Sequence, residues 1–359
     1  MARSGPKLTR IARTLGVSAA TVSNALSGKG RVSAEMVEKI RATAAELGYV
    51  PSQAGRALRT GRTGVIGLVL PDIANPLFPQ IAQAIELAAS SSGYGVLIAD
   101  SRGDVSTQTK AIERLIDRDV DGLVIVPRRG TRIADVGCPV AVIDTPSTPG
   151  NTVAADHWGG GQQIAAHLKA LGHRRVLIIG NNPASNVQND RAGGIRSVFG
   201  DGCHTDTLWI EPLERVSGKG CSLGLAEKVA DGYTAFACIS DLHALRALTE
   251  LQRAGINVPE KASVTGFDDL IWAPVITPAL TTARMDMTEI AAIAVAALVK
   301  AISERDPSDP SIGAPVTAET SKVPMHLVVR QSAAAPPAGH SIHPPITAAT
   351  SVTEGGHQP

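Results

Sequence analysis

The first fifty residues carry apolar positions at helical spacing, interrupted by two short polar breaks. The first apolar stripe is followed by Gly16, a residue type that commonly ends a helix. Ser18 is a suitable N-cap for the second stripe, and the third begins after Ser33. Helices are therefore predicted at 8–15, 18–26 and 34–48. Because only a few residues, one of them glycine, separate the first two, the pattern predicts a helix-turn-helix.

After Thr63 the pattern changes to short apolar runs that alternate with amphipathic stretches. Strands are predicted at 65–70, 95–99, 122–126, 140–143, 176–180, 207–210, 235–239 and 263–267, and helices at 76–92, 105–119, 160–171, 189–199, 221–230 and 241–254. The apolar segment 290–299 suits a further buried helix. Such βαβ alternation predicts parallel sheets covered by helices. The strands are too many for one small sheet, so we expect two similar lobes.

Composition narrows the class of protein. The chain has 359 residues, 43% of them hydrophobic but only 3% aromatic, so aliphatic side chains must form most of the core. The four cysteines are scattered and no histidine stands at metal-ligand spacing, which predicts reduced structural thiols and no metal or cofactor. No apolar run reaches the length of a membrane span. We therefore expect a soluble, cytoplasmic protein without a membrane partner.

The small net charge of +1 hides an uneven distribution. Residues 1–62 hold eleven Lys and Arg against three Glu, whereas the remainder holds twenty-three basic and thirty acidic residues. A basic segment joined to an acidic body is the electrostatic pattern of a nucleic-acid-binding protein.

The predicted second helix has two chemically different faces. Its apolar residues can join the small core, and the opposite face is small and polar, so it could enter a DNA major groove. The hydroxyls of Ser18, Thr21 and Ser23 suit phosphate oxygens, although capping or solvation would also explain them. Asn24 has the amide geometry for a bidentate contact with adenine.

The headpiece sequence resembles a known family. The run IARTLGVSAATVSNALSGKGRVS, followed by ELGYVPS, is similar to the headpiece of the LacI/GalR family of bacterial transcriptional regulators. The resemblance implies that Ala19, Ala20 and Asn24 face the bases. Many members have arginine or histidine in place of Asn24, so an operator sequence cannot be transferred from a relative.

Residues 51–62 are expected to form a hinge. A helix over about Gln53–Arg59 has two turns and is too short to be stable alone, so a disordered linker is the alternative. The resemblance implies that this segment folds on the operator and inserts Leu58 into the central minor-groove step. Arg56 and Arg59 would then meet phosphates.

Candidate ligand-binding residues follow the predicted strands of the body. Ligands of two-lobed α/β proteins bind at the carboxyl ends of parallel strands. Asp72, Ser240, Asp241 and Asp268 stand at such positions, and Arg191 lies near the start of the helix after strand 176–180. Solvation is the ordinary alternative for any one of them.

The resemblance to the LacI/GalR family extends over about residues 64–330, through PDIANPLF, RDVDGLVIVP, DRAGGIRS, ISDLHALRAL and SVTGFDDL. It implies that Arg191 and Asp268 contact an effector. Ser240 replaces the asparagine of an N-D motif and is followed by the expected Asp241. Leu77 and Phe78 occupy two positions that are aromatic in the family, so one stacking ring is missing. The implied effector is sugar-like or nucleoside-like.

The predicted fold class is an all-α helix-turn-helix headpiece joined to an α/β, two-lobed domain like the periplasmic binding proteins. The expected domains are a headpiece at 1–50, a hinge at 51–62, a body at 63–330 and a disordered tail at 331–359. Within the body, lobe 1 is expected at about 63–155 and 286–325. Lobe 2 is expected at about 156–280 with a closing strand near 326–330.

The sequence thus predicts a homodimeric repressor that binds a pseudo-palindromic operator in double-stranded DNA under control of a small effector. A sugar-binding protein of the periplasmic type is one alternative, but the basic headpiece and the absence of a signal-peptide pattern oppose it. An α/β enzyme with a fused DNA-binding domain is another, and no catalytic constellation supports it. Gly159–Gly161 precede a helix without G-x-G-x-x-G spacing, which favours close helix packing over a phosphate site.

Overall fold

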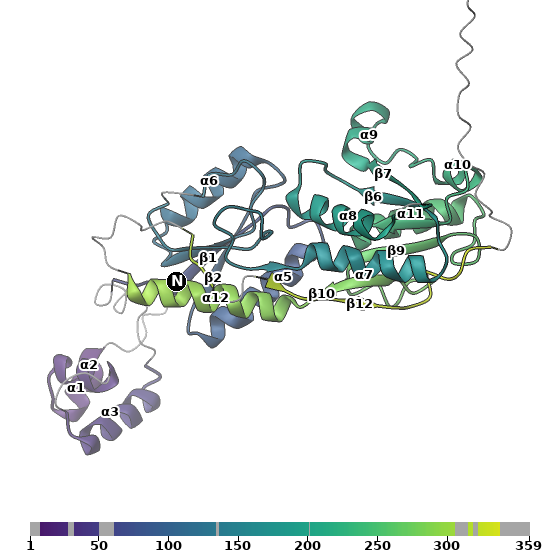
Figure 1. Ribbon diagram of the computed structural model, residues 1–359. Helices are drawn as coiled ribbons and strands as arrows, with labels where there is room; N and C mark the ends of the chain where they lie inside the picture. The colour runs from purple at the N-terminus through teal and green to yellow at the C-terminus, as the bar shows by residue number, and fades with distance from the viewer. Residues whose placement is uncertain are drawn as a thin grey trace, which may run out of the picture. The chain divides into compact units, whose positions relative to one another are not determined.

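A computed structural model describes residues 8–27, 32–49, 61–133, 136–200, 202–305, 315–318 and 322–337. The chain divides into two compact units (Figure 1). The first, here called the headpiece unit, contains the residues up to Val65 together with Asp119–Asp121. The second, here called the body, contains the remainder.

Among its described residues, the headpiece unit has three short helices: α1 (Leu8–Leu15), α2 (Ala19–Ser27) and α3 (Ala34–Glu46). Ile11, Val22 and Ile40, one from each helix, are fully buried and form the centre of its core. The Ser18 hydroxyl accepts a hydrogen bond from the Thr21 N–H at 3.0 Å, and Ser33 caps α3. The helix-turn-helix prediction is confirmed.

Asp121 fixes the chain that follows the hinge. Its carboxylate accepts hydrogen bonds from the backbone N–H groups of Thr63 and Gly64, each at 2.8 Å. The Thr63 hydroxyl donates to the carbonyl oxygen of Asp119 at 3.0 Å. The chain is thus anchored at the point where the first strand begins.

The first lobe of the body is built on a sheet with strand order β2-β1-β3-β4 in the described residues. These strands are β1 (Val65–Leu70), β2 (Gly95–Asp100), β3 (Gly122–Ile125) and β4 (Val140–Val142). The central strand β3 pairs in parallel with both β1 and β4. Helices α5 (Leu77–Ser91), α6 (Val105–Ile116) and α12 (Met287–Glu304) pack on this sheet (Figure 1).

The second lobe has a larger sheet with strand order β12-β10-β9-β8-β6-β7 in the described residues. Its strands are β6 (Arg175–Gly180), β7 (His204–Trp209), β8 (Ala235–Cys238), β9 (Ser263–Asp268), β10 (Thr281–Met285) and β12 (Met325–Val328). Neighbouring strands of this sheet pair in parallel, except that β12 runs antiparallel to β10. The accompanying helices are α7 (His157–Ala170), α8 (Asn186–Val198), α9 (Ile210–Ser217), α10 (Leu225–Ala230) and α11 (Asp241–Arg253).

In the residues that the structure describes, the chain passes between the lobes three times. It crosses after β4 through β5 (Ala154–Ala155), returns between β10 and α12, and crosses again through β11 (Lys322–Val323) to β12. Strands β5 and β11 pair in parallel, so two of the crossings are hydrogen-bonded to each other. Each lobe is therefore assembled from segments distant in sequence.

Glycine allows α7 and α8 to approach closely. A methyl group on Gly161 would overlap the carbonyl oxygen of Arg191, and one on Gly194 would overlap that of Trp158. Because the overlapping atoms belong to the backbone, relieving either overlap would require the two helices to move apart, at a large cost in packing energy. Close packing thus explains the glycine run at the start of α7, as the sequence indicated, and it fixes the helix that carries Arg191.

The structure corrects several sequence-based expectations. Helix α9 was not predicted, and strand β10 lies just outside the bounds expected for lobe 2 although it belongs to that lobe's sheet. The helix expected from residue 221 begins only at Leu225. The reason is that the Glu250 carboxylate accepts the N–H groups of Leu223 and Leu225, while Gly224 adopts a left-handed φ of 69°.

The prediction places the start of the disordered tail too early, at residue 331. Residues 331–337 are described and lie against β9. Ser332 is fully buried, its carbonyl oxygen accepts the Val264 N–H at 2.7 Å, and its hydroxyl accepts the Thr281 N–H at 2.9 Å. Composition alone suggested disorder because small polar residues rarely drive folding, but here they satisfy the ends of existing strands.

His173 joins this terminal segment to the second lobe. Its Nε2 lies 2.9 Å from the carbonyl oxygen of Ala334, which can only accept, so Nε2 carries the proton. Nδ1 then accepts from the hydroxyl of Thr234 at 2.8 Å. Burial lowers the pKa of His173 to about 4, and nearby His167 adds to the lowering against the opposing bond to Ala334.

Replacement of His173 by glutamine is expected to reduce the acid sensitivity of the fold. Because the folded state holds the pKa of His173 below its usual value, unfolding takes up a proton as the pH falls from about 6.5 towards 4. The neutral histidine therefore stabilises the fold above pH 6.5, and this contribution is lost below it, by about 2 kcal/mol at pH 5. Urea unfolding at pH 7.5 and pH 5 measures the change, with exposed His326→Gln as the control. An equal pH dependence in wild type and His173→Gln would contradict the assignment.

Candidate functional site

Helix α2 presents one exposed face. Ala19, Ala20 and Asn24 are exposed on it, whereas Val22 and Ala25 are buried in the headpiece core. The face is small and polar, as the sequence indicated, and could enter a major groove without steric conflict.

The hydroxyl residues at the start of α2 have a local role. Ser18 and Thr21 lie 2.8 Å apart through their hydroxyl oxygens, and Ser18 also caps the helix. Capping, the alternative considered from sequence, thus accounts for both, although either hydroxyl keeps capacity for a phosphate. Ser23 is half-buried. The three predicted hinge contacts, Arg56, Leu58 and Arg59, lie outside the described residues.

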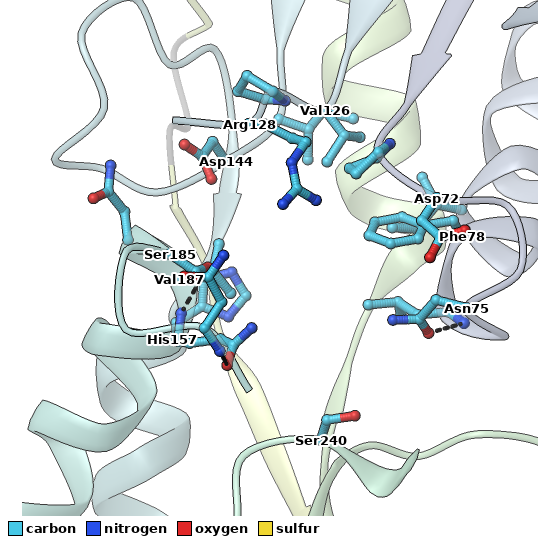
Figure 2. A pocket seen from close by; sticks show the side chains of 18 of the residues that line it. Asp72, Asn75, Phe78, Val126, Arg128, Asp144, His157, Ser185, Val187 and Ser240 are labelled. Atoms are coloured by element: carbon cyan, nitrogen blue, oxygen red, sulfur yellow. Dashed lines mark hydrogen bonds between the residues drawn. The ribbon is translucent and has the colours of Figure 1, made fainter. Parts of the chain in front are cut away.

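A cavity of about 490 Å³ lies in the body, at the carboxyl ends of strands from both sheets. Its wall includes residues that directly follow β1, β3 and β4 in the first lobe and β6 and β8 in the second. Figure 2 shows side chains from the two lobes facing each other across it. The location agrees with the strand-end rule for two-lobed α/β domains, and the volume suits a small molecule.

The cavity brings together most of the predicted ligand-binding residues. Leu77 and Phe78 contribute from the start of α5, and Arg191, Ser240 and Asp268 contribute from the second lobe.

Asp241 is the exception, and its predicted contact with an effector is wrong. The residue is fully buried, and its carboxylate accepts the Leu270 N–H at 2.7 Å and the Thr282 hydroxyl at 2.6 Å. It does not line the cavity. Burial, and the nearby charge of Asp268, raise the pKa of Asp241 to about 7. Asp241 therefore holds β9 and β10 to α11 beneath the site.

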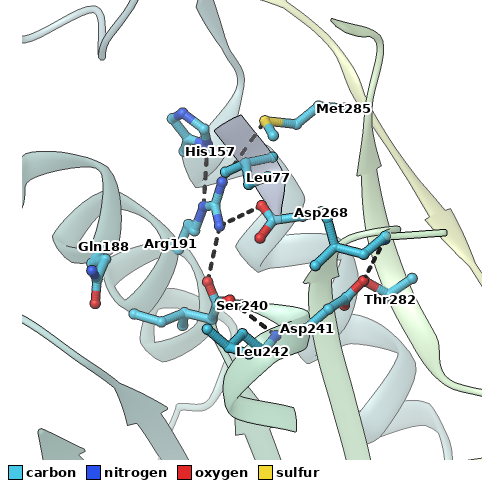
Figure 3. A network of polar contacts seen from close by, with 12 residues as sticks. Leu77, His157, Gln188, Arg191, Ser240, Asp241, Leu242, Asp268, Thr282 and Met285 are labelled. Carbon is cyan, nitrogen blue, oxygen red and sulfur yellow. Dashed lines mark hydrogen bonds and ion pairs between the residues drawn. The ribbon is translucent and has the colours of Figure 1, made fainter. Parts of the chain in front are cut away.

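Arg191 and Asp268, which both line the cavity, form a buried ion pair (Figure 3). The Nη1 atom of Arg191 lies 2.8 Å from the Asp268 Oδ1 and also donates to the carbonyl oxygen of Ile239 at 2.9 Å. Its Nε donates to Nδ1 of His157 at 3.3 Å, and its Nη2 contacts the sulfur of Met285 at 3.8 Å. Nη2 is thus the part of the guanidinium with donor capacity left for a ligand.

Protonation states follow from this arrangement. Burial, and then the charge of Arg191, hold the pKa of His157 well below its usual value, so the ring is neutral and can accept from Arg191. Burial raises the pKa of Asp268 to about 6, although Arg191 and the Ser240 hydroxyl oppose the rise. Near pH 7.5 the pair therefore carries one positive and one negative charge.

The backbone at Asp268 is strained. Asp268 has a φ of 108° and Asp269 a φ of 53°, both in the left-handed region that favours glycine. Strain of this kind costs about 1–3 kcal/mol per residue and often marks ligand sites. Arg330 holds Asp269 by an ion pair of 2.7 Å, and Arg191 holds Asp268, so the strained turn is fixed from both ends.

Several cavity residues escaped the sequence analysis, among them Arg128, Asp144, Asn181 and Gln188. The strand-end rule could have found three of them. Arg128, Asp144 and Asn181 follow β3, β4 and β6, whereas the strand-end residues predicted from the sequence belong to β1, β8 and β9. Gln188 lies within α8, and its side-chain oxygen accepts the N–H groups of Asn181 and Asn182. No pattern in the sequence indicates that this side chain reaches back to the loop before the helix.

In the described part of the chain, no group of three His, Cys, Asp or Glu side chains is placed to hold a metal ion. None of the described helices is long and apolar enough to cross a lipid bilayer.

Comparison with known proteins gives consistent matches in both units. Residues 7–52 match the family described as bacterial regulatory proteins, lacI family, and residues 165–333 match the periplasmic binding protein-like domain. The HTH-type transcriptional regulator DegA of Bacillus subtilis (strain 168) is 31% identical over 295 residues. That alignment covers 79% of this chain and 87% of DegA.

Two solved structures share the fold. The lac repressor dimer bound to operator and the anti-inducer ONPF has a TM-score of 0.75 at 24% identity, covering 92% of this chain and 100% of that chain. A periplasmic binding protein/LacI transcriptional regulator from Alkaliphilus metalliredigens QYMF, complexed with D-xylulofuranose, has a TM-score of 0.66 at 21% identity. It covers 75% of this chain and 99% of that chain.

Proposed function

The chain belongs to the LacI family of bacterial DNA-binding transcriptional regulators, and from this we propose that it is a homodimeric repressor controlled by a small molecule in the cavity. Two headpieces would bind a pseudo-palindromic operator in double-stranded DNA, whose half-site spacing follows from the dimer axis. The protein would act in the cytoplasm, on operators of the nucleoid, and would bind its effector without turnover.

The observation that carries the proposal is the position of Arg191. This arginine lines the cavity, pairs with Asp268, and contacts Met285 at the end of β10, where the chain crosses back to the first lobe. A ligand on Arg191 therefore touches a crossing segment, and it can favour one lobe arrangement over another. Coupling of this kind typically amounts to about 1–3 kcal/mol between effector and DNA.

The chemistry of the cavity favours a sugar-like effector over a nucleoside-like one. Among the described residues that line it, Phe78 is the only Phe, Tyr or Trp, so one flat face can stack but a base has no second ring to lie between. Asn75, Asn181 and Ser240 supply donors and acceptors for hydroxyl groups. The similar protein from Alkaliphilus metalliredigens was solved with D-xylulofuranose, which supports the same class.

Exposed apolar residues support the homodimer. Ile271 and Val275, which follow β9, are 82% and 74% exposed. Apolar residues that lie close together at a surface are typical of protein interfaces. The lac repressor, which shares the fold, was solved as a dimer.

Asn24→Ala is expected to cost about 1–3 kcal/mol of binding free energy at one base-pair position of the operator, because the bidentate contact with adenine would be lost. The measurement compares wild type and variant on an operator and its single-base variants at fixed salt. Lys39→Gln is the control, since it removes a charge of α3 that pairs with Glu35 at 2.8 Å and should not alter the ranking of variants. A uniform loss over all variants would assign Asn24 to the DNA backbone instead.

Selection of bound sequences from random duplex DNA tests the whole proposal. The experiment is done with and without an extract of small metabolites, and the full-length chain should enrich a palindrome. An effector in the extract should change the amount of this DNA that the protein retains. Failure to enrich any sequence in both conditions would contradict the proposed function.

A further inference from the structure

Arg128 lies at the cavity on a loop that is held firmly in place. The loop follows β3, the residue is half-buried, and Figure 2 shows its side chain pointing into the cavity. Gln108, which is fully buried, fixes the backbone on both sides. Its Nε2 donates to the Val126 carbonyl oxygen at 3.1 Å, and its Oε1 accepts the Arg128 N–H at 2.9 Å.

The charge of Arg128 is not balanced by a neighbouring carboxylate. Within the described ranges, no carboxylate oxygen lies within 4.0 Å of its guanidinium nitrogens. The nearby acids have other partners: Asp104 accepts the Thr107 N–H at 2.7 Å, and Asp72 accepts the Ala74 N–H at 3.0 Å. Asp144 accepts the Thr148 hydroxyl at 2.5 Å. The guanidinium thus keeps its donors for a ligand.

The two arginines of the cavity therefore differ in what they can recognise. The charge of Arg191 is neutralised by Asp268, so its remaining donors suit uncharged oxygen atoms such as hydroxyls. Arg128, unpaired and partly removed from water, suits a group that brings its own negative charge. Arg129, next to it, also borders the cavity but is exposed, so water screens its charge.

We infer that the effector is an anionic sugar derivative whose phosphate or carboxylate group binds Arg128 while its hydroxyl groups face Arg191 and Asp268. This inference rests on the proposed function, because it concerns the ligand of the same cavity. The effector class is a sugar phosphate or a sugar acid, and a neutral sugar leaves Arg128 unpaired. Arg128 is then a specificity-determining residue of the first lobe.

Matched probes test the inference on the full-length chain. Titration calorimetry at constant ionic strength compares D-ribose with D-ribose 5-phosphate, and D-glucose with D-glucose 6-phosphate and D-gluconate, with sodium phosphate as the bare anion. At least one anionic probe should bind at least about tenfold more tightly than its neutral partner, as expected for a charge-assisted contact. Phosphate and carboxylate probes distinguish the two possible anionic groups.

The variant Arg128→Gln should remove this preference. Arg132→Gln is the matched control, because Arg132 lies in the same loop region, is exposed and does not line the cavity. The inference is overturned if no anionic probe is preferred by wild type, or if the preference survives in Arg128→Gln with an unchanged urea midpoint. Operator selection by wild type reports separately on the proposed function, since it requires no assumption about the effector.

Discussion

Replacement of Arg191 by alanine is expected to lower the free energy of unfolding of the body by about 3–5 kcal/mol and to abolish the effector response. Arg191 and Asp268 are each almost fully buried, and their ion pair is 2.8 Å long. Removing the guanidinium leaves the Asp268 carboxylate without its counter-charge in a site that already raises its pKa. Urea unfolding followed by tryptophan fluorescence measures the loss, because all three tryptophans, Trp158, Trp209 and Trp272, lie in the second lobe.

Two further variants separate the effect of an unpaired buried charge from the effect of shortening an arginine side chain. Arg196 lies on the same helix, is exposed and donates to the Thr207 hydroxyl at 3.0 Å. Arg196→Ala should lower the free energy of unfolding by less than about 1 kcal/mol. The double variant Arg191→Met with Asp268→Asn removes both charges and should regain much of the stability. A loss below about 1 kcal/mol for Arg191→Ala would show that the pair contributes little.

Gly194→Ala is expected to destabilise the body by about 3 kcal/mol, the upper part of the range for overpacked sites. Alanine normally stabilises a helix relative to glycine by about 1 kcal/mol, so the sign itself is informative. Here the added methyl group would overlap the backbone carbonyl of Trp158, and α7 and α8 would have to separate. Since α8 carries Arg191, affinity for the effector should fall as well.

Gly200→Ala provides the matched control. Gly200 follows α8, an added methyl group would have open space, and its φ is not in the left-handed region. Its effect on the urea midpoint should lie within about 0.5 kcal/mol of zero. If Gly194→Ala behaved like this control, the close contact of the two helices would not limit stability.

The sequence predicts the regular elements well where apolar periodicity is strong. Buried strands such as β1 and β8 read as continuous apolar runs, and the cap at Ser33 marks the start of α3. Prediction fails where partners come from distant residues. The edge strand β7 begins with polar residues. Glu250, about 25 residues further along the chain, accepts the Leu223 and Leu225 N–H groups, so that α10 begins later than its apolar pattern predicts.

The candidate site is predictable in position but not in orientation. The strand-end rule locates Ser240 and Asp268 in the cavity, yet it also selects Asp241, whose side chain turns under the sheet to Thr282. Neighbouring residues at a helix start point in different directions, and periodicity does not decide which one faces a ligand. That Arg191 is already neutralised while Arg128 is not depends on contacts across the fold, which a single sequence does not display.

The triple passage of the chain between lobes has a genetic consequence. The second sheet ends with β12, near the end of the described chain, and residues 331–337 close over it. A nonsense or frameshift mutation between residues 286 and 325 therefore removes the edge strand β12 from a lobe whose other strands are already translated. Truncated genes of this kind should consequently yield chains that keep the headpiece unit but lack an intact second lobe of the body. Late truncations would then be as damaging to effector control as early ones.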